Sequence, residues 1–152
     1  WRGLRQGDGL PAGLPLVAVS NRGQVPPRLD GVDDGSVLLA TAASAPGLAE
    51  ARSSLGDQHV IVCGHERVDP AALLEALGRR GWTRLLTEGG PSWLSTLVEH
   101  DLLDELCLTV APTLVGGDHP RLLSGADVAV DLDLHALLEQ DGTLLGRWLT
   151  RR

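Results

Sequence analysis

The stretch Leu85-Leu86-Thr87-Glu88-Gly89-Gly90-Pro91-Ser92 decides the fold of this chain. It begins as a short apolar strand that ends in a carboxylate, and residues 91–100 then have the spacing of an amphipathic helix. In α/β proteins, ligands bind at the carboxyl ends of strands, and a helix that starts there offers backbone N–H groups to a phosphate. The stretch therefore predicts an α/β fold with a ligand site at this turn.

Each side chain of the turn suggests a role. The Glu88 carboxylate can accept two N–H donors from the edge of a pyrimidine or pterin ring. Gly89 and Gly90 carry no Cβ, so a diphosphate can approach the backbone there. Ser92 can add a hydroxyl donor, although serine in a first helical turn often serves only as a cap. The structural alternatives are an exposed glutamate at the end of a strand and an ordinary tight turn.

Further along the chain, strands and helices alternate before a hairpin. The predicted strands cover residues 14–20, 36–41, 59–64, 84–88 and 105–112. The predicted helices cover residues 46–55 with Ser44 as N-cap, 70–80 with Asp69 as N-cap, and 91–100. Asp141-Gly142 between two apolar runs (129–138 and 143–149) is typical of a hairpin. The order predicts a mostly parallel sheet with a C-terminal antiparallel hairpin, whereas residues 1–13 and 23–35 have loop composition.

Composition limits the class of protein. The 152 residues are 43% hydrophobic and 22% charged, which predicts a single folded domain over 1–152. A net charge of −7 argues against general binding of nucleic acid or of a membrane surface, while leaving room for a local basic pocket. The sequence contains neither an apolar run of membrane-spanning length nor a secretion signal, so we expect a cytoplasmic protein.

Two weaker signals concern metals and cofactors. Cys63 and Cys107 match no metal or redox spacing, so both thiols are expected to be reduced and buried, and no metal site is predicted. Ser20-Asn21-Arg22 ends the first predicted strand, where an arginine can pair with the 2′-phosphate of NADP.

The glycine turn and the strand that follows it resemble a known family, the pyrimidine reductase domain of riboflavin biosynthesis. The matching residues are Leu-Leu-Thr-Glu-Gly-Gly-Pro-Ser at 85–92 and Asp-Glu-Leu at 104–106, followed by Pro112 and the pair Gly116-Gly117. The resemblance is looser elsewhere but covers nearly the whole chain. It implies a dihydrofolate reductase-like three-layer sandwich and an NADPH-dependent enzyme that reduces the ribosyl group of a ribosylaminopyrimidine phosphate to ribityl.

The resemblance also implies roles for individual residues. It places Glu88 at the substrate, and Ser20 at the end of a strand that borders the cofactor. The cofactor diphosphate would lie against Gly89, Gly90, Pro91 and Ser92. Nothing in residues 1–13 matches the strand, helix and strand with which the family's domain begins. We therefore expect an N-terminally truncated domain whose exposed sheet edges favour association, as in a homodimer.

Two alternatives to this function stay open. The chain can be another dihydrofolate reductase-like NADPH enzyme with a different substrate. It can also be a non-catalytic domain that keeps the fold for oligomerisation or ligand binding.

Overall fold

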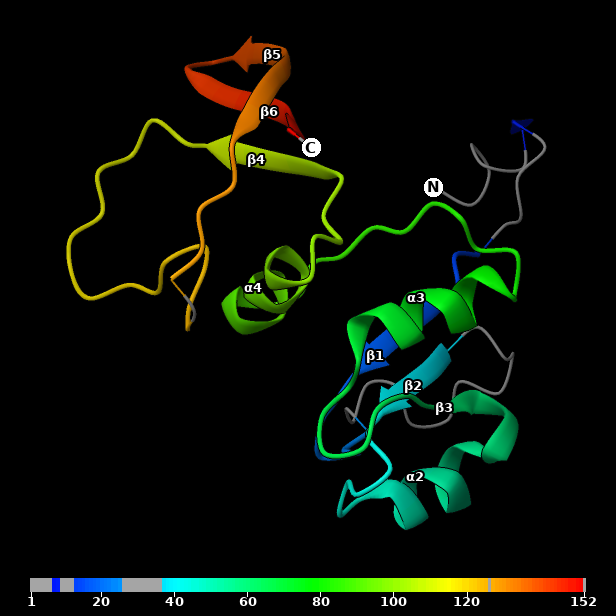
Figure 1. Ribbon diagram of the computed structural model, residues 1–152. Coiled ribbons are helices and arrows are strands. Elements are labelled where there is room, and N and C mark those ends of the chain that lie inside the picture. Colours follow the sequence, from blue (N-terminus) through cyan, green and yellow to red (C-terminus); the bar gives the residue numbers. More distant parts are fainter. Residues whose placement is uncertain (1–6, 9–12, 26–36, 126, 152) are drawn as a thin grey trace. The chain divides into compact units, whose positions relative to one another are not determined.

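A computed structural model describes the chain except for residues 1–6, 9–12, 26–36, 126 and 152, and it divides into two compact units (Figure 1). Unit 1 is Trp1–Arg84 and unit 2 is Leu85–Arg152, and each contains one three-stranded sheet. The predicted α/β class is confirmed, with parallel strands in unit 1 and the antiparallel hairpin in unit 2. Most of the predicted loops at 1–13 and 23–35 lie outside the described residues.

The sheet of unit 1 is parallel and has the order β1-β2-β3. Its strands are β1 (Leu16–Val19), β2 (Val37–Thr41) and β3 (Val60–Val62), slightly shorter than the sequence predicted. All five residues of the central strand are buried, and Leu39 is only 1% exposed. A parallel strand that is covered on both faces has a nearly continuous apolar sequence. The sequence of β2 has this character, which is why the strand was predicted correctly.

The helices of unit 1 are α2 (Leu48–Leu55) and α3 (Pro70–Gly78), with the 3-10 turn η1 (Asp57–His59) between α2 and β3. The predicted Asp69 cap of α3 is confirmed, because its carboxylate accepts the N–H of Ala72 at 3.1 Å. The predicted Ser44 cap of α2 is wrong. That helix is capped by Gly47, and the Ser44 hydroxyl donates instead to the His65 carbonyl at 2.8 Å, so a tertiary contact outcompetes the local one.

Replacing Asp69 by Ala should lower the free energy of unfolding by about 1 kcal/mol, because the N–H of Ala72 loses its acceptor at the start of α3. Urea denaturation followed by circular dichroism measures this change. Asp69→Asn keeps a capping oxygen and should stay close to the wild type. Equal losses in the two variants would contradict the assigned cap.

Unit 2 contains one helix and an antiparallel sheet of order β4-β6-β5. Its elements are α4 (Pro91–Glu99), β4 (Glu105–Val110), β5 (Leu132–Gln140) and β6 (Thr143–Thr150). Asp141 and Gly142 connect β5 to β6 and have φ values of 52° and 78°. Positive φ at both central residues defines the type I′ turn, so the Asp-Gly hairpin prediction is confirmed.

The predicted strand at 84–88 is wrong. Residues 82–90 are neither helix nor strand, and no strand of the described chain pairs with them. The apolar side chains are consequently exposed, with Leu86 at 84%. A strand forms only where a neighbour supplies backbone hydrogen-bond partners, and apolar composition cannot report whether that neighbour is present.

The two cysteines differ in exposure. Both are free, but only Cys63 is buried, and its burial raises the pKa of the thiol. Cys107 is exposed, so the prediction of two buried thiols is wrong for this residue. Its side chain lies on the same face of β4 as that of Glu105, whose carboxylate accepts the Cys107 thiol at 3.3 Å, and this face is solvent-exposed.

Candidate functional site

The turn from Glu88 to Ser92 leads into the first residues of α4. Gly90 caps the helix, and its carbonyl accepts the N–H groups of Trp93 and Leu94, both at 3.1 Å. Pro91 occupies the first helical position and has no N–H to offer. Since the first turn of a helix lacks internal acceptors, the N–H of Ser92 is the first of α4 that can face a ligand.

The structure explains the glycine at position 89 but not the glycine at position 90. A Cβ at Gly89 would lie 2.5 Å from Cδ1 of Trp93, so packing within the protein requires glycine there. A Cβ at Gly90 would meet nothing within 4 Å, and the φ of −67° suits any residue. Neither packing nor backbone conformation requires glycine at position 90, which leaves open space in front of the helix start.

Glu88 precedes Gly90 by two residues in the chain. It is exposed, and no described residue forms a hydrogen bond or an ion pair with its carboxylate. The side chain of Ser92 is also exposed. Thus a carboxylate, a hydroxyl and a backbone N–H are all available within five consecutive residues of unit 2.

Ser20 belongs to unit 1, where it follows the last residue of β1. Its N–H donates to the Ala40 carbonyl at 2.9 Å, and its carbonyl accepts the Thr41 hydroxyl at 2.7 Å. The Ser20 hydroxyl oxygen accepts the N–H of Gln24 at 3.1 Å, which leaves its own proton available to a ligand. Ser20 therefore lies at the carboxyl end of the parallel sheet, where α/β proteins bind their ligands.

The loops at this carboxyl end touch through two glycines that the sequence reading missed. Gly23 has a φ of +69°, and a Cβ there would lie 2.9 Å from the carbonyl carbon of Gly47. A Cβ at Gly47 would lie 2.8 Å from the carbonyl oxygen of Arg22. The loops after β1 and β2 are thus held in backbone contact. The sequence shows only that a glycine occurs in each loop. The spacing of Gly23 and Gly47 does not predict that the two loops touch.

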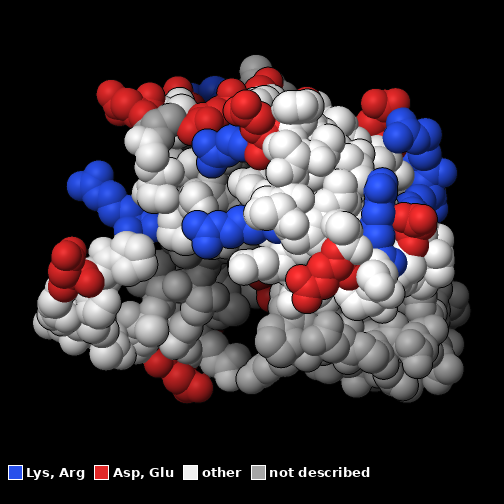
Figure 2. Space-filling view, turned by 90° about the horizontal axis from the view of Figure 1, so that it is seen from below, with Lys and Arg blue, Asp and Glu red and all other residues white. Residues whose placement is uncertain are grey.

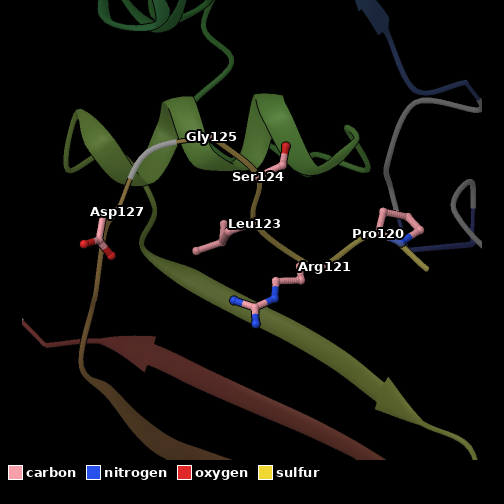
Figure 3. Close-up of a pocket in the computed structure, with 6 residues that line it drawn as sticks. All are labelled: Pro120, Arg121, Leu123, Ser124, Gly125 and Asp127. Atoms are coloured by element: carbon pink, nitrogen blue, oxygen red, sulfur yellow. The ribbon is translucent and has the colours of Figure 1, made fainter. Parts of the chain in front are cut away.

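Unit 2 also has a hollow of about 410 Å³ in the loop between β4 and β5 (Figure 3). Its lining residues are Pro120, Arg121, Leu123, Ser124, Gly125 and Asp127, none of which the sequence predicted. The N–H of Ser124 donates to the hydroxyl oxygen of buried Ser95 at 2.9 Å, and that hydroxyl donates to the Pro91 carbonyl at 2.9 Å. Ser95 therefore ties this loop to the first turn of α4.

The described residues show neither a one-sided charged patch on the face in Figure 2 nor a cluster of metal-binding side chains. On the face shown in Figure 2, basic and acidic side chains of the described residues are interspersed among uncharged ones. Among the described residues, no three potential metal-binding side chains form a cluster, and no helix is long and apolar enough to cross a membrane.

Comparison with known sequences identifies relatives. A family model described as the RibD C-terminal domain matches residues 2–144. A protein of Archaeoglobus fulgidus named 2,5-diamino-6-ribosylamino-4(3H)-pyrimidinone 5′-phosphate reductase is 36% identical over 126 residues, which cover 82% of this chain and 57% of the relative. The protein of the same name from Methanothermobacter thermautotrophicus is 33% identical over 120 residues, covering 76% and 54%. The chain thus spans little more than half the length of these two relatives.

Solved structures share the fold at lower identity. A pyrimidine reductase-like protein of Corynebacterium diphtheriae superposes with a TM-score of 0.80 at 21% identity, covering 99% of this chain and 66% of that protein. RibD of Acinetobacter baumannii superposes with a TM-score of 0.67 at 21% identity, covering 90% and 37%.

Proposed function

The chain belongs to the RibD C-terminal domain family, and on that premise we propose that it acts as a pyrimidine reductase of riboflavin biosynthesis. The substrate would be a ribosylaminopyrimidine 5′-phosphate, the compound class in the names of the two archaeal relatives. The single structural observation that supports this function is the helix start at Gly90, where a Cβ would meet nothing within 4 Å and where Glu88, two residues earlier, has no side-chain partner among the described residues. Because the family model spans both units, we further propose that 1–152 acts as one reductase domain.

The proposed reaction converts a ribosyl group into a ribityl group. A hydride is added to C1′ while the bond from C1′ to the ring oxygen breaks, and that oxygen takes up a proton. We propose NADPH as the cofactor, which would supply the hydride and leave as NADP⁺. The protein's contribution to such a reaction is mainly alignment of cofactor and substrate, so no nucleophilic side chain is required.

We assign the proposed ligands to residues as follows. The N–H groups at Gly90 and Ser92, with the Ser92 hydroxyl, would bind the cofactor diphosphate. Gly89 and Pro91 would shape the turn, the first by admitting the Trp93 ring and the second by starting the helix. Glu88 would bind the edge of the pyrimidine, and the Ser20 hydroxyl would donate a hydrogen bond to the cofactor at the carboxyl end of the unit 1 sheet.

We also propose a cytoplasmic location and a homodimer. Both cysteines are free, as is usual for proteins of a reducing compartment. In the described chain the outer edges of the unit 2 sheet pair with no further strand, and unpaired edges favour self-association.

The test is turnover by the purified chain. With NADPH and 2,5-diamino-6-ribosylamino-4(3H)-pyrimidinone 5′-phosphate, we expect loss of NADPH absorbance and a product heavier by two hydrogen atoms in mass spectrometry. Dihydrofolate in place of the pyrimidine should give no turnover. NADH in place of NADPH tests the proposed cofactor.

Other outcomes would select the alternatives. Turnover of dihydrofolate alone would indicate a reductase with a different substrate. NADPH binding without any turnover would contradict the reductase function and favour a ligand-binding domain.

A further inference from the structure

The Asn21 side chain connects two loops that follow strands which are not neighbours. Its oxygen Oδ1 accepts the N–H of Val68 at 2.8 Å, although the two residues are 47 apart in the sequence. Asn21 belongs to the loop after β1, and Val68 belongs to the loop after β3. Since the sheet order is β1-β2-β3, this hydrogen bond joins the loops on either side of the central strand. It does so at the carboxyl end of the parallel sheet, where α/β proteins bind their ligands.

The loop after β3 gives Asn21 a fixed anchor. The Asp69 N–H donates to the Cys63 carbonyl at 3.2 Å, which closes this loop onto the end of β3. Gly64 within the loop has a φ of +87°, a conformation that suits glycine and lets the chain reverse direction. Val68 itself is only 5% exposed. The N–H that Asn21 binds is therefore held in place by a compact, buried segment.

Asn21 is also part of a turn that begins at Ser20. A backbone hydrogen bond of 3.2 Å closes a β-turn over residues 20–23, with Asn21 and Arg22 at its centre. The Arg22 carbonyl accepts the N–H of Gly47 at 2.9 Å, which ties the turn to the loop after β2. Both central residues of the turn are thus held by partners outside it, one through its backbone and the other, Asn21, through its side chain.

The conformation of this turn determines the direction of the Ser20 hydroxyl. The hydroxyl oxygen accepts the N–H of Gln24, the residue that directly follows the turn. A shift of the turn would move this N–H and release the hydroxyl to other rotamers. The Ser20 backbone lacks this freedom, because its N–H and its carbonyl are both bonded to β2. The hydroxyl direction therefore depends on the turn, and the turn depends on the bond from Asn21 to Val68.

We propose that Asn21 is a positioning residue of the reductase that acts through Ser20. Its bond to Val68 fixes the turn, and the turn holds the Ser20 hydroxyl so that its proton is available to the cofactor. This inference rests on the proposed function and on the role proposed for Ser20, and it assigns Asn21 no contact of its own with the cofactor. Asn21→Ala removes the acceptor for the Val68 N–H and should weaken NADPH binding, although the Ser20 hydroxyl is still present.

The test is a double-mutant cycle on NADPH binding, measured by fluorescence titration of the 152-residue chain. Ser20→Ala deletes one hydrogen bond to the cofactor and should weaken binding about 3- to 10-fold. Asn21→Ala alone should weaken binding by a similar factor. In the Ser20→Ala background, Asn21→Ala should have less than about a twofold effect, because the hydroxyl that it positions is gone. A purely structural role of Asn21 would instead give the same effect in both backgrounds.

Ser44→Ala is the matched control. The Ser44 hydroxyl donates to the His65 carbonyl at 2.8 Å, so this variant also deletes a side-chain hydrogen bond between two loops at the same end of the sheet. That bond lies outside the turn at residues 20–23. We expect urea denaturation to show a loss of stability for both Ser44→Ala and Asn21→Ala, and titration to show a loss of NADPH affinity for Asn21→Ala alone.

The outcomes separate the role of Asn21 from the reductase function. An Asn21→Ala variant that binds NADPH as tightly as the wild type overturns this role and keeps the function. Losses of affinity that add fully in the double variant overturn action through Ser20. A wild-type chain that binds no NADPH overturns the proposed cofactor and this role with it. If Asn21→Ala fails to fold, Asn21→Ser takes its place in the cycle with the same expected result, because its side chain is one bond too short for Val68.

Discussion

Replacing Gly90 by Asp is expected to weaken NADPH binding by at least about 100-fold, because a like charge facing the cofactor diphosphate costs several kcal/mol. The space in front of Gly90 is open, so the new carboxylate would lie where the diphosphate is proposed to bind. Gly90 is also the N-cap of α4, where aspartate is a preferred residue. The variant should therefore be at least as stable as the wild type, which separates loss of binding from loss of folding.

Fluorescence titration with NADPH measures the dissociation constant, and urea denaturation checks the stability. Gly90→Asn is the matched control, because it has nearly the size of aspartate and also caps a helix but carries no charge. It should weaken binding less than Gly90→Asp does. An unchanged dissociation constant in Gly90→Asp would show that the diphosphate does not bind at this helix start.

The elements that the sequence predicted well are those with local causes. The Asp69 cap needs only a carboxylate three residues before Ala72, and the Asp141-Gly142 turn needs only two residues that tolerate positive φ. Strand β2 was identified because burial on both faces makes its sequence continuously apolar. In each case the residues from which the element was predicted are the same residues that form it.

The features that the sequence did not predict depend on distant partners. Residues 84–88 have strand composition but no strand beside them in the described chain, and Cys107 is exposed because nothing in the described chain buries its face of β4. The same limit applies to the candidate site. Its glycine pair was visible in the sequence, but only the structure shows that Gly89 packs against Trp93 while Gly90 faces open space.

Replacing Gly64 by Ala is expected to lower the free energy of unfolding of unit 1 by about 3 kcal/mol. Gly64 follows β3 with a φ of +87°, and a left-handed backbone costs a residue with a Cβ about 1–2 kcal/mol. The Cβ would also lie 2.0 Å from the Arg67 carbonyl oxygen and 2.8 Å from the Asp69 nitrogen. Both neighbours are backbone atoms, so relief requires the loop to move, at a further cost of about 1–3 kcal/mol.

Gly81→Ala is the matched control, because Gly81 has a φ of +82° but its Cβ would meet nothing within 4 Å. Urea denaturation should show a loss of about 1–2 kcal/mol for this variant, from backbone conformation alone. The Gly64 carbonyl accepts the N–H of Ala43 at 3.0 Å and so holds the loop after β3 to the loop after β2. If Ser20 at this same sheet end binds the cofactor, Gly64→Ala should also weaken NADPH binding, whereas Gly81→Ala should not. Equal losses of stability in the two variants would contradict the backbone overlap at Gly64.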